Sequence, residues 1–345
     1  MTRASACATA PSAQLAADRV LVDGGGAADA VVAGYFALAG ELPGGLLSPV
    51  TILVAGPGVA GRAFDGRATQ PGAGAKRPRG FVDESVPMAA RAAVSRAPHA
   101  VLLLQANHGR RSLKKNAAQG VALAKSAGAT KRASFLDRVS EGGSVALASA
   151  NDAILRVAGV FSSGLITEED LVEARPADAP ARVIDHTSST GESMRVHLEP
   201  WAGSENGAAP ELAAAHAIAA VDSRGLLVVL TSFIAAGGSP NVAQLVVPEI
   251  EIALPLVAEP VRRGKTRVAP GAIFAVQPTL AAVDCGPDLR LAVSALGGLD
   301  IEKATTAFGA RPIEDGLRSI AEASSLVGVI STARDARPVA FRTQA

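Results

Sequence analysis

The pattern of apolar and polar positions divides this chain into a helical first half and a second half rich in short strands. Apolar residues three and four apart predict amphipathic helices. Residues 29–39 are apolar on nearly all sides, which predicts a buried helix. Thr167 precedes three acidic residues and predicts the N-terminus of another helix. The other helices expected in this half lie at residues 12–21, 112–127, 133–139 and 151–157.

Short apolar runs between turns predict the strands. The β-branched run at 50–55 and the run at 59–65 flank a Gly-Pro-Gly turn and predict a hairpin. Residues 187–206 are polar, and we expect a loop there. Further strands are expected at 215–221, 226–234, 242–247, 272–276, 279–283, 289–294 and 327–332, and helices at 301–306 and 313–324. Helices outside and strands in the middle favour a layered α+β body.

The amino-acid composition argues against nucleic acids, membranes and metal ions as binding partners. Lys and Arg number 33 against 32 Asp and Glu, and aromatic residues make up 3%, which argues against nucleic-acid binding. No apolar run approaches the ~20 residues that cross a bilayer, and residues 1–6 lack the apolar core of a secretory signal. We therefore expect a cytoplasmic protein that does not bind membranes. Cys7 and Cys285 lie far apart, and no two histidines have the i, i+4 spacing of a helical metal site, so we expect no metal.

Several motifs occur in one order along the chain. Residues 24–33 (GGGAADAVVA) are similar to G-G-N-A-V-D-A-A-V-A, residues 65–71 (DGRATQP) to D-F-R-E-M-A-P, and residues 163–171 (SGLITEEDL) to G-G-L-I-T-x-E-D-L. Shorter likenesses follow at 216–225, 277–280 and 296–298. Together these stretches resemble the gamma-glutamyltranspeptidase family, a branch of the N-terminal nucleophile (Ntn) hydrolases.

The resemblance implies a four-layer αββα sandwich formed by a single domain, residues 1–345. Residues 1–211 would match the family's large subunit and residues 212–345 its small subunit. Family members cut their own chain so that a threonine becomes N-terminal, and its hydroxyl attacks the γ-glutamyl amide. The family reaction needs no cofactor.

The sequence departs from the family where the reaction occurs. The nucleophile position falls on Ala214 or Ala215, and neither carries a hydroxyl. Phe233 and Ala235 stand near the supporting threonine and asparagine, and residues 274–275 (Phe-Ala) replace a serine pair. We therefore expect one uncleaved chain that cannot transfer γ-glutamyl groups.

Parts of the family's binding apparatus have matches. Arg67, with Asp65 beside it, matches the arginine that grips the substrate α-carboxylate, although an ion pair with Asp65 is the alternative reading. Gly297 and Gly298 match the backbone donors of the oxyanion hole, or form a turn. Glu251 lies near the place of the acid that holds the substrate α-amine. A small amino-acid or acyl ligand is the expected partner, and the apolar replacements favour a less polar ligand than glutathione.

Two other functions stay open. His216 as a base with Thr231 or Ser232 nearby would support acid–base chemistry in a remodelled pocket. Alternatively, the chain would be a non-catalytic subunit, pairing with an active homologue or with a second copy of itself.

Overall fold

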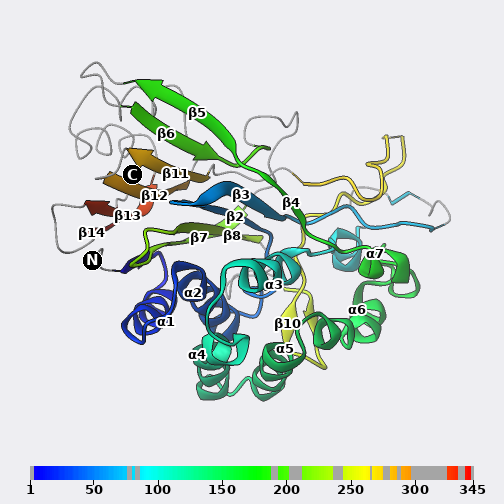
Figure 1. Cartoon of the computed structure of the whole chain (residues 1–345). Coiled ribbons are helices and arrows are strands. Elements are labelled where there is room, and N and C mark those ends of the chain that lie inside the picture. The colour runs from blue at the N-terminus through cyan, green and yellow to red at the C-terminus, as the bar shows by residue number, and fades with distance from the viewer. Residues whose placement is uncertain are drawn as a thin grey trace.

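The computed structural model describes residues 4–75, 80–81, 86–187, 193–201, 212–235, 244–264, 266–274, 280–285, 289–296, 325–332 and 339–342. The described helices are α1 (Pro11–Val22), α2 (Ala27–Glu41), α3 (Ala97–His108), α4 (Leu113–Ser126), α5 (Thr130–Ala148), α6 (Asn151–Ala158) and α7 (Glu168–Val172). They gather on one side of the molecule (Figure 1). None of these helices is long and apolar enough to cross a membrane.

Two antiparallel sheets make up the rest of the body. The first has the order β1-β7-β8-β2-β3-β4, with bounds Ser5–Ala8, Leu212–Val221, Leu227–Ala235, Val50–Gly56, Val59–Gly66 and Ala177–Pro180. The second has the order β14-β13-β12-β11-β6-β5, with bounds Val339–Arg342, Ser325–Thr332, Leu289–Leu296, Leu280–Cys285, Ser193–Leu198 and Arg182–Thr187. A small hairpin joins β9 (Val246–Val247) to β10 (Ile252–Ala253).

The first sheet is the middle layer of the described part. In β2, Val50, Ile52 and Val54 belong to the core under the helices, whereas Leu53 and Ala55 pack in the core between the two sheets. Because both faces are covered, β2 is apolar on both faces except at Thr51, instead of alternating between apolar and polar residues. The described residues thus form a helix–sheet–sheet arrangement, which confirms an α+β fold (Figure 1).

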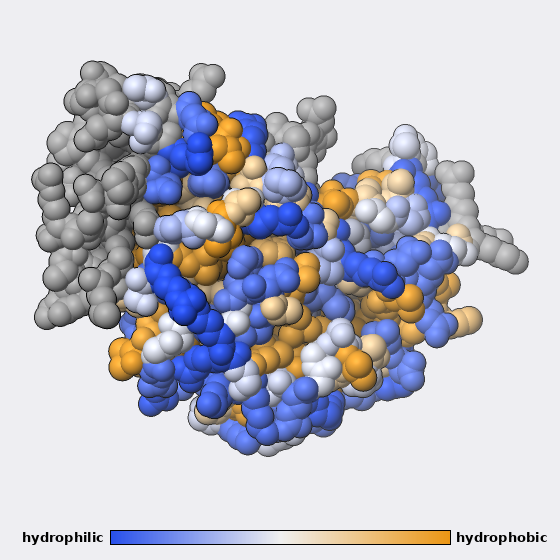
Figure 2. All heavy atoms as spheres, in the orientation of Figure 1, coloured by the Kyte–Doolittle hydropathy of each residue, from blue (hydrophilic) through white to orange (hydrophobic). Residues whose placement is uncertain are grey.

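Helix α2 is buried along almost its whole length, as its sequence predicts. Small residues let it approach α4 closely: a Cβ at Gly40 would lie 2.0 Å from the carbonyl oxygen of Gly120. Such contact requires glycine on both helices. On the outer face, hydrophilic residues cover much of the helical layer (Figure 2).

Several expectations for individual elements are confirmed and others need correction. Thr167 caps α7, because its hydroxyl accepts a hydrogen bond from the Asp170 amide at 3.1 Å. The expected loop at 187–206 was wrong in part, since β6 occupies Ser193–Leu198. The expected strand at 242–247 is reduced to β9 in the described residues, and at 272–274 only an isolated bridge of Ile273 to Thr69 is found. Helix α3 and strands β1, β4 and β5 were not expected from the sequence.

The second helical layer of the expected four-layer sandwich depends on residues 301–306 and 313–324. These lie outside the described residues. The four-layer arrangement therefore stays a prediction.

Candidate functional site

The strands that carry or precede the predicted site residues, among them Arg67 and Ala214, bring these residues together at one end of the two sheets. In the first sheet Val50, at the start of β2, pairs with Gly66 at the end of β3 and with Ser232 near the end of β8. The start of β7 lies at the same end, since Leu212 pairs with Ala235. In the second sheet the last residue of β6, Leu198, pairs with Ala281, near the start of β11. Antiparallel pairing therefore brings together segments more than a hundred residues apart in sequence.

A row of polar side chains crosses the first sheet at this end. Thr51 pairs with Thr231 on one side and with Asp65 on the other, so all three project from the same face. They share this face with Leu53, which packs between the two sheets. The Thr231 hydroxyl lies 2.8 Å from that of Ser294 on β12, and both residues are buried. This hydroxyl pair joins the two sheets at the site.

The start of β7 carries the residues at the expected nucleophile position. Ala214 pairs with Ile234, and Ala215 pairs with Phe233. Alternation along β7 and β8 places Ala215 and Phe233 on the face of Thr231, toward the second sheet. A methyl group and a fully buried phenyl ring therefore border the polar row at this edge.

Arg67 leaves the end of β3 and turns back onto Asp65. Its Nε and Nη2 donate to the two carboxylate oxygens of Asp65 at 2.9 and 3.1 Å. Arg96 adds an ion pair to Asp65 at 2.7 Å and donates from Nε to the Arg67 carbonyl at 3.0 Å. Burial favours the neutral acid, but the hydrogen bonds and charges of Arg67 and Arg96 outweigh it and lower the pKa of Asp65. The expected ion pair of Arg67 with Asp65 is present, and it is buried instead of lying on the surface.

Glu199 and Trp201 complete the cluster, and sequence reasoning did not identify either of them. They follow the last residue of β6, and the Trp201 Nε1 donates to Glu199 Oε2 at 3.0 Å. The Arg67 guanidinium stacks over the Trp201 ring at 5.3 Å from its centre. Glu199 is 3% exposed, and this burial raises its pKa to about 8, although the Trp201 hydrogen bond and the Arg67 charge oppose the rise. The signal in the sequence is the single tryptophan two residues after an acid, at the end of an alternating polar–apolar stretch.

His216 and its two proposed partners are divided between the faces of the first sheet. Ser232 is the direct cross-strand neighbour of His216, in a row that also holds Val50 of the helix-side core. Thr231 projects from the opposite face. The Nδ1 of His216 lies 3.2 Å from the Thr9 hydroxyl. The Ser232 hydroxyl is buried and has no hydrogen-bond partner among the described residues.

The remaining predicted residues lie elsewhere or outside the described part. Glu251 caps the N-terminus of α5: its Oε2 accepts from the amides of Lys131 and Arg132 at 3.1 and 3.3 Å. Its carboxylate therefore serves a helix of the outer layer in this structure, and its expected role beside the ligand stays a prediction. Gly297 and Gly298 lie outside the described residues, directly after the end of β12. No group of three or more metal-ligating side chains occurs within the described ranges.

Comparisons with known proteins give structural relatives but no sequence relatives. No family model and no curated protein matches the chain. Among solved structures, the cephalosporin acylase from Bacillus halodurans superposes with a TM-score of 0.65 at 13% identity, over 99% of this chain and 96% of that one. The chain therefore shares the fold of this acylase.

Two further structures resemble it. One described as LmbA2991HD has a TM-score of 0.62 at 16% identity, over 99% of this chain and 98% of that one. The gamma-glutamyltranspeptidase from Pseudomonas nitroreducens complexed with L-DON has a TM-score of 0.45 at 17% identity, over 54% of this chain and 68% of that one.

The fold gathers a charged cluster beside an apolar strand start. Arg67 and Arg96 carry two positive charges, and Asp65 carries one negative charge. Glu199 is mostly protonated at neutral pH, because its pKa is about 8. The cluster therefore has an excess of one positive charge in a buried setting, which favours an anionic group over a cationic one.

Proposed function

We propose that this protein is a gamma-glutamyltranspeptidase-like chain that remains uncleaved, does not transfer γ-glutamyl groups, and binds a small carboxylate-bearing acyl or amino-acid ligand at the Arg67 end of its sheets. The observation that carries the proposal is the pair of alanines, Ala214 and Ala215, at the start of β7. Acyl transfer in an Ntn-type site needs a hydroxyl or thiol nucleophile there. A methyl group cannot attack a peptide bond, so neither self-cleavage nor transfer can begin from this position.

The charge of the cluster supports a carboxylate ligand. A carboxylate placed beside Arg67 would neutralise the excess positive charge. The planar guanidinium is held in one orientation by Asp65 and by stacking on Trp201. Phe233 on the neighbouring strand supports an apolar group next to that carboxylate. N-acyl amino acids combine both features, and glutathione lacks the apolar part.

Two measurements test the proposal. The intact mass of the purified chain should be that of one 34.6 kDa polypeptide. A heavy and a light fragment, the lighter one beginning with Ser or Thr, would refute the uncleaved state. Calorimetric titration should show tighter binding of an N-acyl amino acid than of glutathione. The Arg67→Ala substitution should abolish binding of the N-acyl amino acid. An Arg62→Ala variant, which changes a partly exposed arginine of β3, the strand that Arg67 directly follows, is the matched control.

A second candidate function rests on the geometry of His216. A base needs a hydroxyl within reach and a group that orients its ring. His216 has Ser232 as its cross-strand neighbour and Thr9 at Nδ1, whereas Thr231 is turned away and bonded to Ser294. If the chain catalyses acid–base chemistry, Ser232→Ala and His216→Ala should each abolish turnover of the substrate. Unchanged turnover in His216→Ala would remove this residue from the mechanism.

A further inference from the structure

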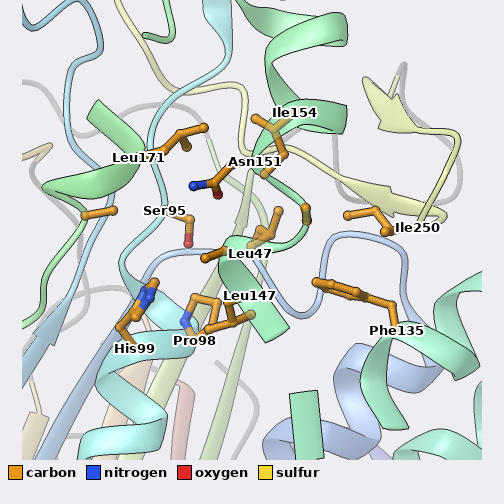
Figure 3. Close-up of a pocket in the computed structure, with 13 residues that line it drawn as sticks. Leu47, Ser95, Pro98, His99, Phe135, Leu147, Asn151, Ile154, Leu171 and Ile250 are labelled. Carbon is orange, nitrogen blue, oxygen red and sulfur yellow. The ribbon is translucent and has the colours of Figure 1, made fainter. Parts of the chain in front are cut away.

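A separate cavity lies among the helices. It has a volume of about 70 Å³ and is bounded by α3, α5, α6, α7 and the loops that precede β2 and β10 (Figure 3). The lining residues are Leu47, Ser95, Pro98, His99, Phe135, Leu147, Ala148, Ala150, Asn151, Ile154, Leu171, Ala174 and Ile250. Neither the family resemblance nor the proposed function assigns a role to it.

A break in α5 makes room for this cavity. Gly143 interrupts the helix with φ 54° and ψ −127°, a conformation that L side chains rarely adopt. Phe135 lines the cavity from the segment before the break, and Leu147 and Ala148 line it from the segment after the break. The two parts of α5 thus enclose the cavity from different directions. Ala148 is exposed, so the cavity opens to solvent on this side.

The lining is apolar except at three side chains, and none of the lining residues carries a formal charge. Burial lowers the pKa of His99, so its imidazole is neutral at pH 7. A charged ligand would lose its hydration here without gaining an opposite charge. The lining therefore excludes ions and favours a neutral molecule.

The three polar side chains can hold a hydrogen-bonding head group. The Ser95 hydroxyl accepts from the Ala97 amide at 3.2 Å, which leaves its own proton to donate. His99 Nδ1 is buried and has no hydrogen-bond partner among the described residues. Ser95 and Asn151 turn their polar ends toward the cavity, and Phe135 and Ile250 lie on its other side (Figure 3). A buried polar atom without a partner lowers stability, and a ligand that bonds to His99 would remove that cost.

We propose that this cavity binds a small neutral molecule that carries one amide or hydroxyl group on a compact, branched apolar body. The polar group faces Ser95, His99 and Asn151, and the apolar body packs against Phe135 and Ile250. A closed cavity of ~150 Å³ holds benzene, so an occupant of the same size must extend past Ala148 into solvent here.

One segment connects this cavity to the charged cluster. Ser95 and Pro98 line the cavity, and Arg96 between them binds Asp65 and the Arg67 carbonyl. Arg67 in turn stacks on Trp201, the only tryptophan of the chain. A ligand that shifts residues 95–98 should therefore change the intrinsic fluorescence of the protein.

Isobutyramide and isobutyrate test the proposal, because they have the same shape and differ in charge. Ligand-observed NMR titration at pH 7 should give saturable binding of isobutyramide, at least tenfold tighter than that of isobutyrate. The fluorescence of Trp201 should change with the same midpoint. Equal affinities, or no saturation with isobutyramide, would overturn the proposal and leave a cavity that holds only solvent.

Two variants locate the binding. Ala148→Phe should close the opening and weaken isobutyramide binding at least tenfold. Val145→Phe places the same ring on the same helix at a position that is 78% exposed and does not line the cavity, and it should bind as the wild type does. His99→Leu should weaken the amide but not a purely apolar probe such as cyclopentane. Unchanged amide binding in both Ala148→Phe and His99→Leu would place the ligand elsewhere and refute the assignment.

Discussion

Replacing Glu199 by glutamine should change how the stability of the protein depends on pH. Glu199 is almost fully buried, accepts a hydrogen bond from Trp201 and has a pKa of about 8 in the folded chain. In the unfolded chain its pKa returns to 4.5, the ordinary value. Between these two values the folded state holds a proton that the unfolded state has released. The contribution of Glu199 to stability is therefore fully present below pH 4.5 and is lost as the pH rises to about 8.

The size of the effect follows from the two pKa values. Each pH unit between them corresponds to 1.36 kcal/mol, so the carboxyl lowers the free energy of unfolding by roughly 5 kcal/mol across the whole interval. Glutamine has nearly the same shape, keeps an oxygen for Trp201, and does not titrate. The Glu199→Gln variant should lack this loss, and its stability relative to the wild type should rise steadily from pH 5 to pH 8.5.

Urea denaturation at half-unit pH steps measures this difference, because subtracting the wild-type curve cancels the titration of all other groups. Glu168→Gln, which removes an exposed carboxyl on α7, is the control and should give a nearly flat difference. A flat difference for Glu199→Gln as well, or one that falls with pH, would show that Glu199 is ionised in the folded protein. The charge argument for a carboxylate ligand would then fail.

Three more predictions concern the site and the packing around it. Arg67→Lys keeps the charge but loses the planar fork, so carboxylate affinity measured by calorimetry should fall at least tenfold, and unchanged affinity would exclude the guanidinium from binding. Thr231→Val leaves the Ser294 hydroxyl buried and unpaired, so urea denaturation should show a loss of roughly 1–3 kcal/mol; adding Ser294→Ala should recover part of it, and a further additive loss would argue against the pair. Gly40→Ala forces a Cβ against the backbone of Gly120, so the free energy of unfolding should fall by about 3 kcal/mol or more, and a neutral result would mean that α2 and α4 separate freely.

Local sequence patterns predicted the buried elements of this fold, because in these segments every local signal favours the same structure. The run at 50–55 is apolar except for Thr51, and it forms a strand that is covered on both faces. Thr167 with its acidic followers forms the cap that its sequence indicates. In these places propensity, burial and hydrogen bonding favour the same structure.

Tertiary context decided the rest. Strand β6 carries Arg195 and His197 between apolar residues, and this polar sequence indicated a loop. The segment is nevertheless a strand, because it pairs with β5 on one side and with β11 on the other. Glu251 was assigned to the ligand from its position in the sequence, but its carboxylate binds the start of α5. Glu199 was missed because nothing in a single sequence shows that an acid will be enclosed by residues from another sheet.

The interleaving of the two halves of the chain has a consequence for how it can be divided. Residues 1–211 supply β1, β2, β3 and β4 to the first sheet and β5 and β6 to the second, and residues 212–345 supply the remaining strands of both. Neither half has a complete core of its own. A cut between residues 211 and 212 should therefore leave the fragments associated, and two separately produced fragments should fold only when they are mixed.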